Sequence, residues 1–475
     1  MDTEFIRNAL REASCRTGAF FTLYIEDRTE RSLIYQHELK DLQSLRVQGA
    51  SLEGFRGENR ASAYSGDVSE KGMIKLLTSV EEMLTIISSQ EDTPESFLPR
   101  QSHDDAASVP GDASAEEDTT VPGLSFREEI GLGIVRNCER TLQEAGLTGS
   151  FRYRYTELTR LVRVTTSSGE ETSEIQRNCA LRLYYTLDIP DEGNRNESIG
   201  SISGWTQFVM AAGPEDFPQD TCAANFVDHL MSRLNRQQAK SVPKGSYPVV
   251  FSPNCGGTFW HECCGHQLEG NAVFSHASDF EGKIGEAVAS ELVTLVDDGT
   301  LPGAYGTGVY DDEGVRKRRN VLIDRGVLKQ YMCDRYHGAL LGNGSNGCGR
   351  RQDYTFSATC RMSNTLLAPG QDNPEDIVRE IPLGLYVKSL GGGSGGKVFS
   401  ILCTEGYMIR DGKLAEPISE CMLSARGSEV MFLVDRVCND FVMEPSGGSY
   451  CGAGSGLVGV TASSPTFRLK EMEVG

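Results

Sequence analysis

Long apolar runs are absent from the 475-residue sequence, in which no stretch approaches the roughly 20 residues that a membrane-spanning helix needs. The first residues, Met1-Asp-Thr-Glu, lack the basic and apolar regions of a secretory signal peptide. From both absences we expect a cytoplasmic protein with no membrane partner.

Positive charge is also scarce. Lys and Arg total 46 against 67 Asp and Glu, which gives a formal net charge of −21. A surface with this balance disfavours binding to nucleic acid or anionic lipid, so we expect no nucleic-acid partner. The glycine run at 391–396 is not followed by Lys-Ser or Lys-Thr, which excludes a Walker-type phosphate loop.

A small-domain cysteine framework is missing as well, although the chain has 14 cysteines. They are scattered along a chain too long for one core, so most are expected to be buried free thiols in a reducing compartment. The length instead predicts two or three domains.

The residue pattern predicts an α+β fold. We expect an N-terminal mixed α/β-type domain over 1–240 and a mostly antiparallel, β-rich domain over 241–475 that carries one helix near residue 261. Pro243, Gly245 and Pro248 mark the boundary. Within the first domain, a segment over about 88–123 rich in Ser, Asp, Glu and Pro predicts a flexible acidic linker.

Periodicity indicates individual elements in both halves. Helical spacing is found at 4–13, 73–87 and 223–238, and strand patterns at 20–25, 151–155, 159–166 and 180–187. In the second half, Asp411-Gly412 and Asp324-Arg-Gly326 are typical two-residue hairpin turns. Val296 followed by Asp297-Asp-Gly299 predicts a similar turn.

Histidine is rare, with seven in the chain, yet two lie in residues 256–270, GGTFWHECCGHQLEG. His261 and His266 are five positions apart. On an ideal helix that spacing separates the rings by about 140°, so both reach one ion only if the turn widens locally, as in a π-bulge, or ends between them. Gly265 is a plausible place for this distortion. Glu262 would then lie beside the metal as a general base.

A catalytic zinc needs a third protein ligand and one open position. The candidates are a distant Cys, a distant carboxylate, His276, and the thiols of Cys263 and Cys264, although small buried thiols that pack the helix are the more ordinary interpretation. Cys451 stands out because glycines flank it on both sides and let backbone approach a metal closely. Three further residues could orient the ligands: His276, Glu269 and Glu286.

Two other motifs have alternative interpretations. The glycine run at 391–396 could offer free backbone groups to an extended peptide, or form a plain loop. Arg350 and Arg351 could hold a substrate carboxylate, or lie in a solvated basic turn.

The segment from Tyr247-Pro-Val-Val to residue 270 resembles the H-E-x-x-x-H signature of the TldD/PmbA family of metalloproteases, on its TldD, active side. Further landmarks follow in the family's order: Gly282-Lys-Ile-Gly-Glu, Val296-Asp-Asp-Gly-Thr, Asp311-Asp-Glu-Gly, Val327-Leu-Lys-Gln-Tyr, Gly349-Arg-Arg, Arg361-Met-Ser-Asn-Thr, Leu390-Gly-Gly-Gly and Cys451-Gly. A weaker likeness extends to Gly49-Ala-Ser-Leu-Glu-Gly and Ala63-Tyr-Ser.

The resemblance implies zinc bound by His261, His266 and Cys451, with Glu262 as general base, in a peptidase for short or unfolded peptides. It also implies a homodimer, or a heterodimer with a PmbA-like sister subunit, that encloses the active site. The sequence departs from the family pattern at Cys263 and Cys264, where small or apolar residues are usual, and at Gln267, where glycine is common. Two alternatives stay open: a non-catalytic peptide-binding or modulator subunit, and a hydrolase that tailors a biosynthetic peptide or amide.

Overall fold

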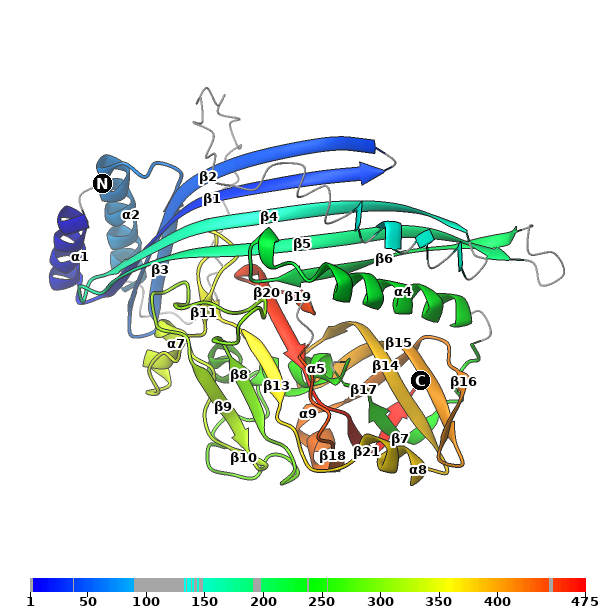
Figure 1. Cartoon of the computed structure of the whole chain (residues 1–475). Coiled ribbons are helices and arrows are strands. Elements are labelled where there is room, and N and C mark those ends of the chain that lie inside the picture. The colour runs from blue at the N-terminus through cyan, green and yellow to red at the C-terminus, as the bar shows by residue number, and fades with distance from the viewer. Residues whose placement is uncertain are drawn as a thin grey trace.

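The computed structural model describes residues 3–36, 38–88, parts of 132–144, 148–190, 198–236, 239–253, 255–443 and 447–475. The fold is α+β, as predicted, with mostly antiparallel sheets and few helices (Figure 1). The predicted acidic linker lies outside the described residues from 89 onward. Within the described ranges, no helix combines the length and the apolar character needed to cross a membrane.

The first half forms a six-stranded antiparallel sheet in the order β3-β2-β1-β4-β5-β6. Its strands are β1 (Phe20–Gln36), β2 (Glu38–Arg56), β3 (Asn59–Ser65), β4 (Gly149–Thr166), β5 (Glu171–Pro190) and β6 (Ser198–Met210). Phe151, Tyr153 and Tyr155 are buried while Arg152 and Arg154 are exposed, which is the predicted alternation of a half-buried strand. The strands predicted at 151–155 and 159–166 are one continuous strand, because its pairing with β1 and β5 runs through both without a register shift. The buried face changes between Glu157 and Val162.

Three fully described helices pack on this sheet: α1 (Thr3–Thr17), α2 (Glu70–Ser88) and α4 (Gln219–Asn235). Val135, from the partly described helical residues at 132–144, is buried in the same core as α4. Helices α1 and α2 contain the patterns predicted at 4–13 and 73–87, whereas α4 begins four residues before the predicted 223–238 and ends at Asn235. The apolar faces of α1 and α2 share a core with β1 to β3, and α4 shares another with β4 to β6. The helices therefore cover opposite ends of the sheet (Figure 1).

The second half contains three sheets. One has the order β10-β9-β8-β13-β20-β19, and is antiparallel except between β13 and β20. Its strands are β8 (Leu295–Asp298), β9 (Arg319–Asp324), β10 (Val327–Leu328), β13 (Asn364–Leu367), β19 (Gly448–Ala453) and β20 (Gly456–Ser463). A two-stranded sheet pairs β11 (Gly349–Arg350) with β12 (Thr359–Cys360).

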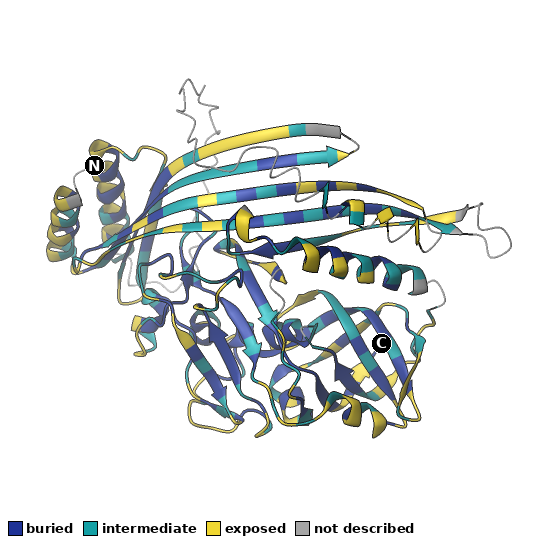
Figure 2. Ribbon diagram, in the orientation of Figure 1, coloured by how far each residue is buried: buried dark blue, intermediate teal, exposed yellow. Residues whose placement is uncertain are grey.

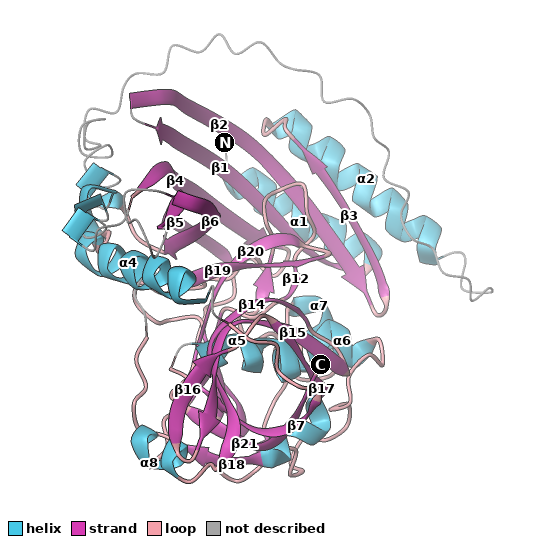
Figure 3. Ribbon diagram, turned by 90° about the vertical axis from the view of Figure 1, so that its right-hand side faces the viewer, coloured by secondary structure: helices cyan, strands magenta, loops and turns pink. Residues whose placement is uncertain are grey.

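The third sheet has seven strands, five of which close a ring through the pairings β14–β7, β7–β21, β21–β17, β17–β15 and β15–β14 (Figure 3). The strands are β7 (Gly245–Phe251), β14 (Leu383–Ser394), β15 (Val398–Arg410), β16 (Lys413–Pro417), β17 (Cys421–Arg426), β18 (Val434–Val437) and β21 (Phe467–Val474). Short helices lie between the strands: α5 (Cys255–Trp260), α6 (Gly270–Phe274), α7 (Arg335–Leu340), α8 (Pro374–Arg379) and α9 (Gly427–Val430). One large apolar core joins this ring to α5 and the second sheet, and buried residues dominate this half (Figure 2).

Two of the predicted hairpins are confirmed. Arg410 pairs with Lys413 across Asp411-Gly412, and Asp324 pairs with Val327 across Arg325-Gly326. All four loop residues have φ between 47° and 79°, as a two-residue turn of this kind requires.

The turn predicted after Val296 is wrong. Strand β8 continues through Asp298, and its antiparallel partner β9 begins only at Arg319. The Asp298 carboxylate accepts hydrogen bonds from the backbone and hydroxyl of Thr300, which starts a long excursion instead of a hairpin. That excursion reaches the first sheet, where Glu174 accepts from the backbone N–H groups of Val309 and Tyr310.

The face of the first sheet that is turned toward the second half carries charged and polar contacts. Arg160 pairs with Asp312 at 3.0 Å, and Arg351 pairs with Glu53 at 2.9 Å. The first sheet uses strands from residues 20–210 and the other sheets use strands from 245–474. The division into two domains near residue 240 stays a prediction.

Candidate metal centre

The residues between α5 and α6 form a widened turn. A π-helix spans His261–Gly265, and a short 3₁₀ helix, His266–Leu268, follows it directly. The N–H of His266 donates to the carbonyl of His261, so the hydrogen bond spans five residues. This widening brings both imidazoles to one side of the chain, and it confirms the geometry predicted from their spacing.

Gly265 has a different role from the one predicted. Its φ of −53° and ψ of −54° are ordinary helical values, so the widened turn does not depend on glycine's conformational freedom. A side chain at this position would instead collide with the sulfur of Met362. The glycine allows a close approach between the turn and the chain at 362.

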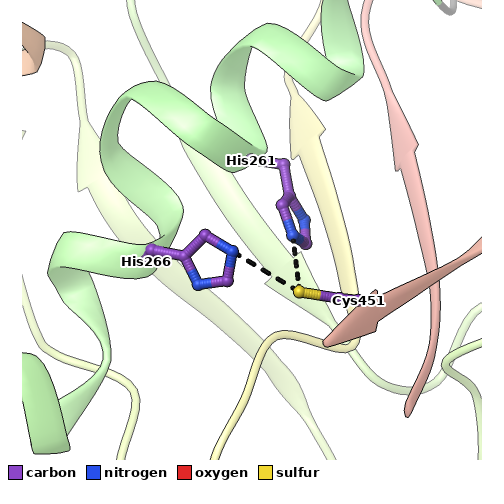
Figure 4. Close-up of side chains that lie close together, drawn as sticks. All are labelled: His261, His266 and Cys451. Atoms are coloured by element: carbon purple, nitrogen blue, oxygen red, sulfur yellow. Dashed lines mark hydrogen bonds between the residues drawn. The ribbon is translucent and has the colours of Figure 1, made fainter. Parts of the chain in front are cut away.

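Cys451 is supplied by the edge strand β19, which forms a hairpin with β20. The Nε2 atom of His261 lies 3.2 Å from the Cys451 sulfur, and Nε2 of His266 lies 3.4 Å from it (Figure 4). The imidazole centroids are 4.8 Å apart with the rings nearly perpendicular. All three donor atoms lie within 4.8 Å of one another.

These distances suit a shared ion. Zinc–sulfur and zinc–nitrogen bonds of usual length in a tetrahedron place nitrogen and sulfur about 3.5 Å apart. Two imidazole nitrogens and a thiolate are also the donor set that a borderline-soft divalent metal prefers. Among the described residues, this is the one cluster of three or more His, Cys, Asp or Glu side chains with suitable donor spacing.

The two histidines have different electrostatic environments. Burial, with smaller contributions from His266 and Arg361, lowers the pKa of His261 well below its usual value and keeps the ring neutral. Burial also acts to lower the pKa of His266, but Glu269 and the Cys451 thiol outweigh it and raise that pKa. The Glu269 carboxylate lies 3.4 Å from Nδ1 of His266. His266 therefore directs its other nitrogen toward Cys451.

Glu262 lies beside this cluster. Its Oε2 atom is 3.9 Å from Nε2 of His266, and its side chain is only 13% exposed. Burial raises the pKa of the Glu262 carboxyl group, while His266 partly offsets that rise. A carboxylate next to the donor atoms and open to a cavity can accept a proton there.

The cavity at this site has a volume of about 1100 Å³ and is lined by His261, Glu262, His266, Cys451 and the glycine run at 391–396. The run is partly strand, since β14 includes residues up to Ser394 and pairs irregularly with β15. A Cβ atom at Gly395 would lie 2.6 Å from Cδ2 of His266 and 3.1 Å from Oε2 of Glu262. The glycines therefore form a wall of the cavity, close to the cluster.

Several other candidate residues lie elsewhere. His276 is 80% exposed on its side chain and bonds Glu281, and Glu286 is exposed. Cys263 and Cys264 are fully buried, and both sulfurs lie near the Trp260 carbonyl, outside the donor cluster.

Arg350 and Arg351 do not lie in a solvated turn. Arg350 donates to the Met362 carbonyl at 2.6 Å, and Arg351 is bonded to Glu53 and stacked over Tyr24. Both arginines are buried.

Comparison with known proteins decides the family. A family model described as "PmbA/TldA metallopeptidase C-terminal domain" matches residues 244–475. A "Metalloprotease TldD homolog" of Buchnera aphidicola subsp. Acyrthosiphon pisum is 28% identical over 98% of this chain and 95% of the relative. The chain belongs to the TldD/PmbA family.

Other relatives align over a shorter span. A "Metalloprotease TldD homolog" of Haemophilus influenzae is 37% identical over 62% of this chain and 61% of its own length. A "Zinc metalloprotease TldD homolog" of Saccharolobus solfataricus is 30% identical over 52% and 56%. The chain thus spans less than two thirds of the length of these two relatives.

The fold is shared with a solved structure. TldE from Thermococcus kodakarensis superposes with a TM-score of 0.70 at 15% identity, and the match covers 99% of this chain and 100% of TldE. At this identity the likeness shows the TldD/PmbA fold and nothing about activity.

Sequence reasoning named one buried residue of this TldD/PmbA chain only as part of a family landmark and gave it no role. Arg361 is fully buried and donates to the Cys451 carbonyl at 2.7 Å, and its Nε lies 3.9 Å from the Glu269 carboxylate. It therefore ties the β19–β20 hairpin to the residue that faces His266. Its partners lie about 90 positions away in the chain, so no local pattern could indicate them.

Proposed function

We propose that the chain is a zinc-dependent peptidase in which His261, His266 and Cys451 hold the metal and Glu262 is the general base. The observation that carries the proposal is the convergence of two imidazole nitrogens and one thiol at a cavity that also contains a carboxylate. The printed names of relatives support it, since they are called metalloproteases and one is called a zinc metalloprotease.

When bound, zinc would polarise the scissile carbonyl and lower the pKa of water at the site. The chain's own residues supply the remaining steps. Glu262 accepts the proton of the attacking water as its oxygen bonds to the carbonyl carbon, and then donates that proton to the amine nitrogen as the C–N bond breaks. Glu269 holds His266 in the orientation that presents Nε2.

The proposed substrates are short or unfolded peptides. An extended peptide has unpaired backbone N–H and C=O groups, and the run at 391–396, in which only Ser394 carries a side chain, can approach such a backbone closely. The volume of about 1100 Å³ accommodates a few residues and excludes a folded domain.

Two further parts of the proposal concern the cell and the assembly. The described cysteines are all free thiols, which agrees with a reducing, cytoplasmic location. We propose a homodimer, or a heterodimer with a PmbA-like sister subunit, that encloses the cavity. Light scattering on the purified chain tests this, and a stable, fully active monomer would contradict enclosure.

The deciding experiment compares Glu262→Gln with His266→Ala and Cys451→Ala. Metal content is measured by elemental analysis, and hydrolysis is followed on an unstructured peptide. Glu262→Gln should retain the metal but lose hydrolysis, while the other two variants should lose both. Full peptidase activity in Glu262→Gln would contradict the role of Glu262 as general base. A wild-type chain with neither metal nor activity would favour the modulator alternative.

A further inference from the structure

A second cavity lies between the first sheet and the second half of the chain, beside the one at the metal centre. Its volume is about 1080 Å³, and strands β4, β5, β6, β19 and β20 all contribute to its lining. Trp205, Ser449 and Tyr450 line both cavities, so the two meet at the edge strand β19. Tyr450 precedes Cys451 directly, which places this junction one residue from a donor of the cluster.

The charge of this cavity is opposite to that of the molecule. Eight arginines and lysines line it against three acidic residues, whereas the whole chain has a net charge of −21. Positive side chains are thus concentrated at one cavity of an otherwise acidic protein, which favours the binding of an anion there.

Four of these cations have no carboxylate within 4.0 Å among the described residues. They are Arg182, Arg316, Lys317 and Arg350, whereas the other four each form an ion pair. Arg182 bonds the Gln207 amide and lies 5.0 Å from the ring centroid of Trp205. Arg316 is exposed, with no side-chain hydrogen bond to the described residues.

The acidic lining residues are already occupied. Glu174 accepts the two backbone N–H groups of Val309 and Tyr310, and Asp312 pairs with Arg160. Asp311 accepts three backbone N–H groups at 2.8 to 3.0 Å. Asp312 and the buried Asp297 act electrostatically on Lys317 and Arg350, but among the described residues no carboxylate lies within 4.0 Å of the four free cations.

Lys317 and Arg350 lie deepest. They are 7% and 9% exposed, and the hydrogen bonds of both go to neutral oxygens: Lys317 to the Gly306 carbonyl at 2.7 Å, Arg350 to the Met362 carbonyl. Burial, together with the nearby Arg350, lowers the pKa of Lys317 to about 8. Two buried, unpaired cations at a cavity wall are costly to the fold unless an anion joins them.

We infer that this second cavity is a substrate subsite that binds a carboxylate of the peptide, with Lys317 and Arg350 at its base and Arg182 and Arg316 at its entrance. The inference rests on the proposed peptidase function. The carboxylate belongs either to an acidic side chain or to the free C-terminus, within a few residues of the scissile bond. Trp205 and Tyr450 provide apolar surface for the chain between the two cavities.

The test measures binding separately from hydrolysis. A dansylated hexapeptide that ends in two glutamates is titrated into full-length Glu262→Gln protein, and fluorescence anisotropy gives Kd. Matched peptides end in two glutamines, and each is used with a free and with an amidated C-terminus. Loss of charge-assisted hydrogen bonds predicts that the glutamine peptide binds about tenfold more weakly. A difference between free and amidated forms assigns the C-terminus as the source.

The subsite variants are Arg182→Gln with Arg316→Gln, at the cavity entrance, and Lys317→Met at its base. Either should bring the acidic and neutral peptides to within about twofold of each other. The control is Arg163→Gln, which removes an exposed arginine of β4 that is not part of the lining. It should keep the full preference for the acidic peptide. Successive side chains of a strand point to opposite faces of the sheet, so Arg163 lies on the face opposite to Leu158 and Arg160, which line the cavity.

The outcomes separate this inference from the proposed function. Equal binding of all four peptides to the Glu262→Gln protein overturns the subsite. A preference that survives in both subsite variants overturns the assignment of these residues. A wild-type chain that shows the preference but never hydrolyses the peptides contradicts the peptidase proposal and leaves the subsite standing.

Discussion

Glu269 determines which nitrogen of His266 faces the cavity. Its Oε1 atom lies 3.4 Å from Nδ1, and the Nε atom of Arg361 lies 3.9 Å from the same oxygen. Glu269 is 3% exposed, so this contact is shielded from water. A metal-binding histidine held in this way is oriented before the metal arrives, and the carboxylate also increases the basicity of the ring.

Replacing Glu269 by Gln should weaken metal binding about 10- to 100-fold, because the neutral amide no longer orients and polarises His266. Competition with a chromogenic chelator measures the affinity. Glu286→Gln, which changes an exposed glutamate outside the cavity lining, is the control. Equal affinities in both variants would show that Glu269 has no influence on the site.

Lys317 gives a prediction for stability against pH. Its pKa in the folded chain, about 8, is below the usual 10.5, so the unfolded chain binds more protons between these values. The free energy of unfolding should therefore gain a contribution on the order of 3 kcal/mol as pH rises from 8 to 10.5. Lys317→Met should lack this gain, and urea unfolding of both chains across that window measures the difference. Parallel pH curves would contradict the assigned pKa.

The spacing of the histidines was sufficient to predict that the helix either widens or ends between them, because geometry alone forbids their convergence on a regular helix. Cys451 was identifiable by its flanking glycines and by the family resemblance. The contacts of Glu269 and Arg361 could not be derived in this way. Their side chains meet only after the hairpin and the turn have been packed together.

At the scale of elements, the glycine run beside β14 contacts the donor cluster. Gly393 and Gly395 pass so close to Glu262 and His266 that a methyl group would intrude, whereas a methyl group at Gly392 would meet nothing within 4 Å. The absence of side chains at two positions therefore keeps the cavity open.

Gly395→Ala should reduce peptidase activity and metal affinity by at least about tenfold, because the added methyl group displaces His266. Stability should change by less than about 1 kcal/mol, since the segment is at the surface of a cavity and not in the core. Gly392→Ala is the matched control and should behave as wild type in kinetics, metal titration and thermal unfolding. A normal active site in Gly395→Ala would show that the run can move aside.

Local sequence specified two of the three predicted turns. The hairpins at 324–327 and 410–413 could be predicted because their loops need positive φ, which Gly and Asp or Asn supply most readily. The loop after β8 could not, since its course depends on hydrogen bonds from residues 309 and 310 to Glu174, more than 130 positions earlier. The tertiary contact with Glu174 therefore determines that the chain after β8 forms a long loop and not a tight turn.

At the scale of the whole molecule, the first sheet and the second half are joined by buried charge. The Arg351 side chain is 1% exposed and contacts Glu53, the hydroxyl of Ser51 and the ring of Tyr24. These partners are about 300 positions away, so sequence reasoning left Arg351 between two alternatives, neither of which included an internal ion pair.

Arg351→Met should lower the free energy of unfolding by about 3 to 5 kcal/mol, because it leaves the carboxylate of Glu53 buried with one cationic partner fewer. Arg46→Met removes an ion pair with Asp27 whose arginine is 63% exposed, and should cost at most about 1 kcal/mol. Urea unfolding of both variants provides the comparison. Similar losses in the two chains would mean that the interface does not depend on this pair.

The edge hairpin that carries Cys451 lies 190 positions along the chain from His261. A metal ion bound by both His261 and Cys451 would cross-link these two segments reversibly. Closing so long a loop strongly restrains the unfolded chain. Removal of the metal by a chelator should then loosen the whole carboxyl-terminal hairpin and expose Tyr450 and its neighbours to proteolysis. Purification in strong chelators would therefore change the conformation of this hairpin as well as remove the metal.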